Sequence, residues 1–193
     1  FKALLFMAAG SIISAMANNQ NIDDMRGFGK AMRFTSIAML CGSLALAAFP
    51  FTSGFFSKDE ILAYATDRGG MYLIFTVLGY LGALITAVYT FRLVFRVLPG
   101  KPCKEAQELI DTGHLAHETP RNPASGEEED TDVGFPGAEH HIAEQSPSMK
   151  VAMAILSVLA LFAGFVQVPG LDHAVTSFLE PTFAGSPLAA IEP

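Results

Sequence analysis

The sequence predicts an all-α protein, a fragment of a polytopic transmembrane helix bundle with one broken helix and a long hydrophilic loop. Of its residues, 51% are hydrophobic and 16% charged, and the mean hydropathy of +0.38 is above that of most soluble domains. The acidity is local, because residues 99–148 carry a net charge of −8 while the whole chain carries −7. Acidity confined to one loop gives no indication of nucleic-acid binding.

The first apolar stretch, residues 1–17, is expected to be a transmembrane segment of minimal length. Residues 3–22 carry no charge, but the amide side chains at 18–21 are too polar to face lipid. About 17 residues is the short limit for a spanning helix. Because the chain begins with Phe1 and is apolar at once, we expect it to be a fragment that starts inside a span.

The second apolar stretch, residues 34–65, is too long for one continuous spanning helix. Its 32 residues would measure about 48 Å as a helix, whereas the hydrocarbon core is about 30 Å thick. Pro50 interrupts helices and Gly54 tolerates irregular dihedrals, so we expect a break near 50–56. Ser57 and Glu60 form a capping-box pattern, which predicts that a second helix starts there.

Lys58 is the main candidate functional residue, because it would lie one residue into the second half of the broken helix. Helix breaks in membranes gather at transport sites, where protein or water satisfies the freed backbone groups. Burial disfavours the charged form of a lysine, which allows proton exchange near neutral pH. A second interpretation stays open: after an unbroken helix that ends near Phe56, Lys58 is an interfacial residue that extends to the headgroups.

Two more spans are predicted after a tight turn. Residues 71–97 begin with 21 uncharged residues, and Gly79 and Gly82 form a small-residue face for helix packing. Residues 149–170 contain the fourth apolar run, and residues 171–193 are expected to be an irregular tail.

The distribution of basic residues predicts the topology. If each of the four apolar segments crosses once, residues 18–33 and 92–150 share one side with nine Lys or Arg, and the other side holds only Arg68. The positive-inside rule then places both connections in the cytoplasm. The same count requires residues 34–65 to cross once, in two pieces.

The acidic loop, residues 99–148, is expected to be cytoplasmic and flexible, because its hydrophobicity is low and its net charge high. Its histidines, with Glu118 and Glu139 nearby, leave a metal site open as the weaker alternative. These histidines are His114, His117, His140 and His141.

No metal and no cofactor is expected in this chain. The sequence holds no glycine-rich phosphate loop, no HExxH and no cysteine set for an iron–sulfur cluster. Cys41 and Cys103 stand apart, without metal-ligand spacing, and are expected to be reduced. Redox chemistry is therefore not expected of these residues.

Two motifs resemble a known family. They are Phe-Lys-Ala-Leu-Leu-Phe at residues 1–6, followed by Ala-Gly-Ser at 9–11, and Gly-Phe-Phe-Ser-Lys-Asp-Glu-Ile-Leu at 54–62. Both closely resemble the antiporter-like membrane subunits of proton-pumping NADH:quinone oxidoreductase, respiratory complex I. That family is shared with multisubunit sodium/proton antiporters. The resemblance is strong over residues 1–100 and weak over 146–170, and the acidic insert is longer than the family pattern.

The resemblance implies proton translocation by a subunit of an enzyme complex. It implies that Lys2 relays protons along a central hydrophilic axis and that Lys58 is the terminal donor. Asp59 is a weaker candidate, as an electrostatic partner of Lys58. Hydroxyl groups at the break are expected to hydrogen-bond a water chain; these belong to Thr52, Ser53 and Ser57.

The resemblance also implies the setting of the chain. Its expected partners are the other membrane subunits of the complex and the lipid bilayer, and its expected location is a bacterial inner membrane. Two alternatives stay open: a subunit of a sodium/proton antiporter, and a structural membrane subunit that does not pump. The structural alternative predicts that both lysines can be neutralised without loss of function.

Overall fold

The computed structural model describes residues 1–16, 19–112, 147–168, 172–173, 178 and 181–182. The four histidines and most of the acidic loop lie outside these residues, as does most of the tail, so the expectations for them stay predictions.

Within the described residues the all-α prediction is confirmed. The elements in order are α1 (Lys2–Ala15), α2 (Phe28–Ala31), α3 (Arg33–Leu46), α4 (Ser53–Arg68), α5 (Tyr72–Val97), α6 (Lys104–Thr112), α7 (Pro147–Phe162) and the 3₁₀ helix η2 (Ala163–Val166). Two strands of two residues each, β1 (Gln167–Val168) and β2 (Asp172–His173), pair antiparallel. β2 lies inside the segment that we expected to be irregular.

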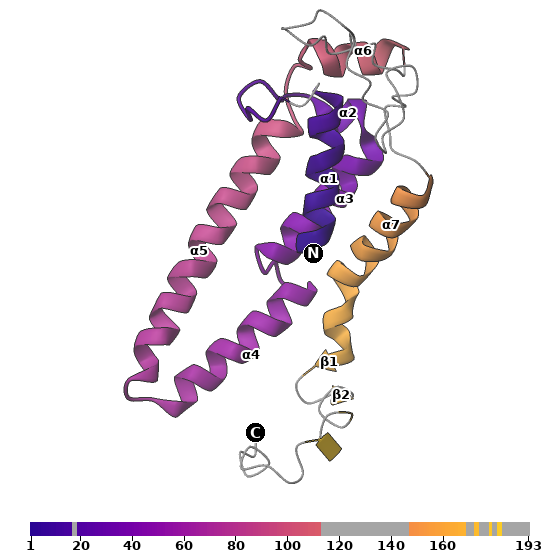
Figure 1. Cartoon of the computed structure of the whole chain (residues 1–193). Helices are drawn as coiled ribbons and strands as arrows, with labels where there is room; N and C mark the ends of the chain where they lie inside the picture. Colours follow the sequence, from indigo (N-terminus) through magenta and orange to yellow (C-terminus); the bar gives the residue numbers. More distant parts are fainter. Residues whose placement is uncertain (17–18, 113–146, 169–171, 174–177, 179–180, 183–193) are drawn as a thin grey trace, which may run out of the picture.

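The broken helix follows the length of the molecule in two pieces. α3 and α4 both pack against α5, which has 26 residues and runs alongside the pair. Figure 1 shows α4 continuing in the direction of α3 rather than turning back. The prediction of one broken helix is therefore confirmed, and a hairpin is excluded.

The break itself lies at residues 47–52, slightly earlier than the sequence suggests. The backbone has positive φ at Ala48 (56°) and Phe51 (68°), on either side of Pro50. L-residues seldom adopt this region, and a helix cannot continue through it. Thr52 is then extended and precedes α4.

Two expectations about the start of α4 are wrong. Ser57 is not a cap, because α4 already begins at Ser53 and the Ser57 hydroxyl donates to the Gly54 carbonyl inside the helix (3.3 Å). Lys58 is accordingly the sixth residue of α4. Gly54 is helical and not irregular; its role is a close approach, since a methyl group there would collide with the Ala45 carbonyl oxygen.

The buried core lies where α1, α3 and α7 meet. Leu4, Ile12, Met39 and Met153 are all within 1% of complete burial, and α3 packs against both α1 and α7. Gly42 of α3 lies against Leu4 and Leu5 at the start of α1, so these two helices run antiparallel. The end of α3 and the start of α1 are therefore neighbours.

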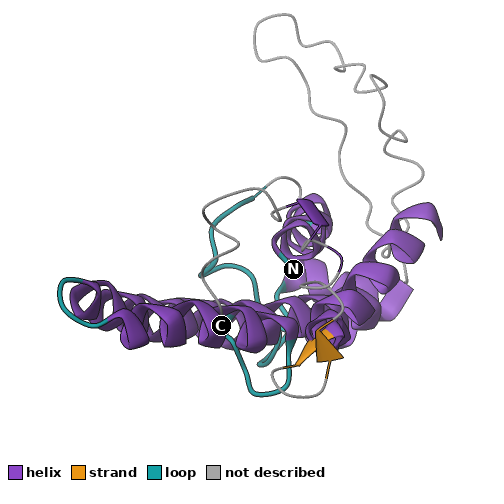
Figure 2. Cartoon of the chain, turned by 90° about the horizontal axis from the view of Figure 1, so that it is seen from below, coloured by secondary structure: helices purple, strands orange, loops and turns teal. Residues whose placement is uncertain are grey.

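The lower part of the molecule is a thin layer with much exposed apolar surface. Seen from below (Figure 2), many of the helical segments lie side by side in one row with the strand pair against one side, while others lie off this row. Two described helical runs are long and apolar enough to cross a membrane, namely α5 and the run Pro147–Val166 formed by α7 and η2. Only 11% of each apolar window is buried, so lipid or other proteins have to cover them.

Candidate functional site

Lys58 binds the end of the helix that precedes the break. Its Nζ donates a hydrogen bond to the carbonyl oxygen of Leu46, the last residue of α3, at 2.6 Å. The last carbonyls of a helix lack intrahelical donors, and the helix dipole makes this end negative. The break thus creates an acceptor that suits an ammonium group.

The neighbouring carbonyls of α3 already have other donors. The amides of Ala47, Ala48 and Phe49 donate to residues 43–45 as the chain leaves the helix. Lys58 supplies the donor for Leu46 from across the break. The lysine therefore acts as a side-chain cap on α3 and joins the two halves of the broken helix.

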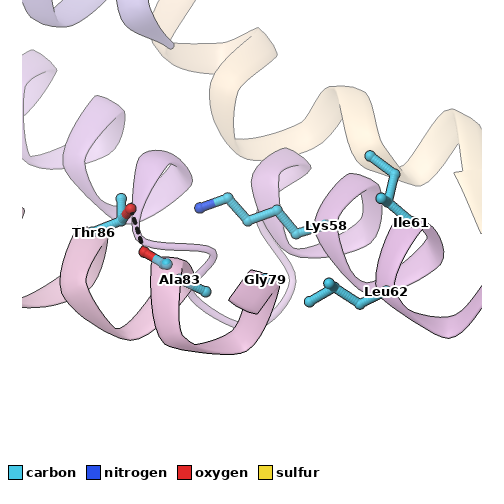
Figure 3. Close-up of a pocket in the computed structure, with 7 residues that line it drawn as sticks. Lys58, Ile61, Leu62, Gly79, Ala83 and Thr86 are labelled. Carbon is cyan, nitrogen blue, oxygen red and sulfur yellow. Dashed lines mark hydrogen bonds between the residues drawn. The ribbon is translucent and has the colours of Figure 1, made fainter. Parts of the chain in front are cut away.

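A cavity of about 300 Å³ lies beside Lys58, between α4 and α5. The Lys58 amino group points toward the side of Thr86 in Figure 3, away from Ile61 and Leu62. The lining residues are Lys58, Ile61, Leu62, Gly79, Gly82, Ala83 and Thr86.

The small residues of α5 explain why this space is open. The Leu62 side chain packs against Gly79, where a methyl group would collide with it, but nothing lies within 4 Å of the corresponding position at Gly82. The only polar side chains of the lining are Lys58 and Thr86, whose hydroxyl donates to the Gly82 carbonyl (2.7 Å). The cavity therefore leaves Lys58 space to move. Two oxygen atoms of α5, the Thr86 hydroxyl and the Gly82 carbonyl, belong to its lining residues.

The three hydroxyl groups at the break all donate to carbonyl oxygens. Thr52 donates to Phe49 (2.7 Å) and Ser53 to Ala160 of α7 (2.6 Å), while Ser57 donates within α4. These bonds hold the helix ends in place. A water chain along these hydroxyls stays a prediction.

Pro50 and Asp59 are exposed in this structure. Pro50 lies in the connection between α3 and α4, where it needs no amide donor. Asp59 follows Lys58 on α4, and no ion pair joins the two residues in the part of the chain that the structure describes. A role of Asp59 as electrostatic partner stays a prediction.

Lys2 is exposed at the first turn of α1. Because α1 starts beside the end of α3, Lys2 lies at the same level of the bundle as the break. No hydrogen bond or ion pair joins it to Lys58 among the described residues. The structure thus brings together Lys58, Leu46 and Thr86, and a relay from Lys2 stays a prediction.

Leu46 and Thr86 were missed by sequence reasoning. Leu46 acts through its backbone, which no side-chain pattern reveals. For Thr86 a signal exists, because Thr86 and Thr90 are one turn apart in a span without charge. The described residues contain no group of three or more metal-ligating side chains.

Comparison with known proteins identifies a matching family and several relatives. Residues 1–86 match the family described as NADH:quinone oxidoreductase/Mrp antiporter, transmembrane. The chain is 49% identical over 115 residues to NADH-quinone oxidoreductase subunit L of Escherichia coli. This alignment covers 59% of this chain and 18% of that protein. It is 46% identical over 107 residues to subunit L of Pseudomonas aeruginosa, covering 55% and 17%.

A eukaryotic relative gives a similar match. NADH-ubiquinone oxidoreductase chain 5 of Acanthamoeba castellanii is 41% identical over 115 residues, covering 59% of this chain and 17% of that protein. The chain thus spans less than a fifth of the length of each of these relatives.

Proposed function

Because residues 1–86 match the NADH:quinone oxidoreductase/Mrp antiporter transmembrane family, we propose that this chain translocates protons as part of a membrane subunit of NADH:quinone oxidoreductase. The chain is part of a membrane protein, and its resemblance to the antiporter-like subunits is confirmed by relatives named subunit L and chain 5. Its proposed partners are the other membrane subunits and the surrounding lipid.

The observation that carries the proposal is the position of Lys58. Its amino group spans a helix break, binds the free carbonyl of Leu46 and borders a cavity. A charged donor makes a stronger hydrogen bond to a carbonyl than a neutral one. When Lys58 gives its proton to water, its attachment to α3 weakens, and the neutral side chain is free to turn into the cavity.

Other residues have supporting roles in this proposal. Lys2 passes protons toward Lys58 along a central axis, and Asp59 adjusts the charge balance around it. The hydroxyl groups of Thr52, Ser53 and Ser57 hydrogen-bond the water near the break. The electron-transfer chemistry belongs to other subunits, so the proposal assigns no cofactor to this chain.

The orientation proposed for the chain is that of a bacterial inner-membrane protein. Residues 18–33 and 92–150 face the cytoplasm in this orientation, because they carry nine of the basic residues. Residues 66–70 face the opposite side.

The proposal is tested by the substitution Lys58→Met in the complete respiratory complex. NADH-driven proton uptake is measured in inverted membrane vesicles, with NADH oxidation and quinone reduction followed in the same sample. Methionine keeps the volume of the side chain and removes the proton site, so we expect proton uptake to be lost while the complex still assembles on a native gel. The matched control is Lys30→Met, an exposed lysine of α2, which should pump normally.

Either of two results would overturn the proposal. Unchanged pumping by Lys58→Met returns Lys58 to an interfacial role and leaves the chain as a structural subunit. Sodium-dependent proton exchange without NADH oxidation in the purified assembly identifies a subunit of a sodium/proton antiporter; antiporters are the second class of protein that the family description names.

A further inference from the structure

We propose that the face of α4 that carries Asp59 is a contact surface for another transmembrane helix, and that this helix presents a lysine or arginine side chain to Asp59 near the centre of the membrane. The inference goes beyond the proposed function, because it concerns the packing of helices and holds whether or not Lys58 transfers protons.

The contacts between α4 and α5 give the level of Asp59 along the span. A short turn joins these two helices, which pack against each other and therefore run antiparallel. The Leu62 side chain of α4 lies against Gly79 of α5. Asp59 precedes Leu62 by three residues, so it lies about one turn beyond Gly79, at the level of Gly82.

This level is near the centre of the membrane. Gly82 lies in the middle part of an uncharged run, residues 71–91, in a helix that is long and apolar enough to span a membrane. A carboxylate at this depth faces lipid only at a large cost in free energy. Asp59 is therefore expected to face protein or a water-filled cavity in the assembled protein.

The described helices leave Asp59 uncovered. It is exposed, and it forms no hydrogen bond or ion pair among the residues that the structure describes. α4 lies between α5 and η2 (Figure 1), with Lys58 toward α5 and Phe56 against Phe165 of η2. Successive residues of a helix are about 100° apart, so Asp59 points away from Lys58, onto a face that neither neighbour covers.

The charge and shape of this face define the partner. In a medium of low dielectric constant, a carboxylate is stabilised by a donor of opposite charge, which lysine and arginine supply. Ala63 is exposed one turn after Asp59 on the same face, and a small side chain lets a second helix approach closely. The chain spans less than a fifth of each relative, so a protein of that length has further segments to supply the helix.

Asp67 is a matched comparison on the same helix. It is also exposed, but it lies in the last turn of α4, next to the turn that leads to α5. At that end of the span a carboxylate reaches the membrane surface and water, so it needs no partner helix. The two aspartates thus differ in depth and not in chemistry.

The first test measures the thermal stability of the complete, detergent-solubilised complex. Asp59→Asn leaves the basic group of the partner helix unpaired, so we expect the midpoint of thermal denaturation to fall by several degrees. Asp59→Lys brings like charges together and should prevent assembly on a native gel, whereas Asp59→Glu keeps the charge and should assemble. Asp67→Asn should leave the midpoint unchanged.

The direction of the Asp59→Asn effect separates the alternatives. An unchanged midpoint is the result for a carboxylate in a water-filled cavity, and a higher midpoint is the result for one that faces lipid. Either of them overturns the inference. If Asp59→Asn does not assemble, Asp59→Glu decides: assembly of this variant supports the need for a negative charge, and its failure overturns it.

The second test identifies what covers the face. A photoreactive benzophenone amino acid replaces Ala63 in the complete complex, and the cross-linked peptides are sequenced after irradiation. The same amino acid in place of Leu62, which packs against α5, is the positive control and should cross-link within the chain. We expect position 63 to cross-link to an apolar peptide that contains lysine or arginine. Adducts with lipid alone, no adduct, or a peptide without a basic residue would overturn the inference.

Discussion

At the scale of single residues, the arrangement depends on two glycines with opposite surroundings. Gly54 lies in the first turn of α4, and the backbone of Ala45 in α3 approaches it so closely that no side chain fits. Gly82 lies in α5 with nothing within 4 Å of its missing side chain. The first glycine permits the contact between the two halves of the broken helix, and the second leaves the cavity beside Lys58 open.

This contrast predicts opposite effects of the same substitution. Gly54→Ala pushes α3 and α4 apart, and we expect it to destabilise the protein by about 1–3 kcal/mol. Gly82→Ala adds a methyl group in open space and favours the helix, so it should be neutral or stabilise by up to about 1 kcal/mol. Thermal denaturation of the detergent-solubilised complex measures both. Equal stability of the two variants would contradict the close contact at Gly54.

At the scale of elements, the break is held by bonds that cross between helices. Lys58 joins α4 to the end of α3, and Ser53 joins the start of α4 to the Ala160 carbonyl near the end of α7. Gly164 of η2 lies against Ser53 and Phe56, so the two helix ends are also packed. The start of α4 is therefore fixed from two sides.

The bond from Ser53 predicts a measurable difference between two nearby serines. Ser53→Ala removes a hydrogen bond between α4 and α7, and we expect a loss of about 1 kcal/mol of stability. Ser57 is exposed and donates only within its own helix, so Ser57→Ala should change stability by much less. The midpoint of thermal denaturation checks the pair. A larger loss of stability for Ser57→Ala than for Ser53→Ala would contradict the expected contribution of the α4–α7 hydrogen bond.

At the scale of the whole molecule, two connections meet at one end of the bundle. The Cys103 amide donates to the Arg26 carbonyl (3.1 Å), and Arg96 forms an ion pair with Asp23. Asp23 and Arg26, which precede α2, therefore lie beside the end of α5 and the residues that follow it. The turn between α4 and α5 lies at the far end of α5 (Figure 1).

This arrangement predicts sided labelling in membranes. With Cys41 and Cys103 replaced by serine, Lys101→Cys should react with a membrane-impermeant thiol reagent in inverted vesicles, where the cytoplasmic face is outside. Arg68→Cys, which is also at an exposed position, should react only in right-side-out vesicles. Labelling of both positions from the same side would contradict a single crossing by α5.

Much of the fold could be predicted from the sequence because hydropathy and charge act locally along the chain. The apolar stretch of residues 34–65 is longer than a membrane crossing and so required a break. The lysine near that break followed from the same stretch. The motifs at 1–6 and 54–62 indicated a resemblance to a family, and the model of that family matches residues 1–86.

The start of α4 and the partner of Lys58 were decided only by tertiary structure. The capping-box pattern at Ser57 was overridden because the positive φ values at Ala48 and Phe51 end the break early and let the helix begin at Ser53. The acceptor at Leu46 is a backbone group, and the bond from Ser53 joins residues 107 apart. Local patterns carry no information about such contacts, because they depend on how α3, α4, α5 and α7 pack in space.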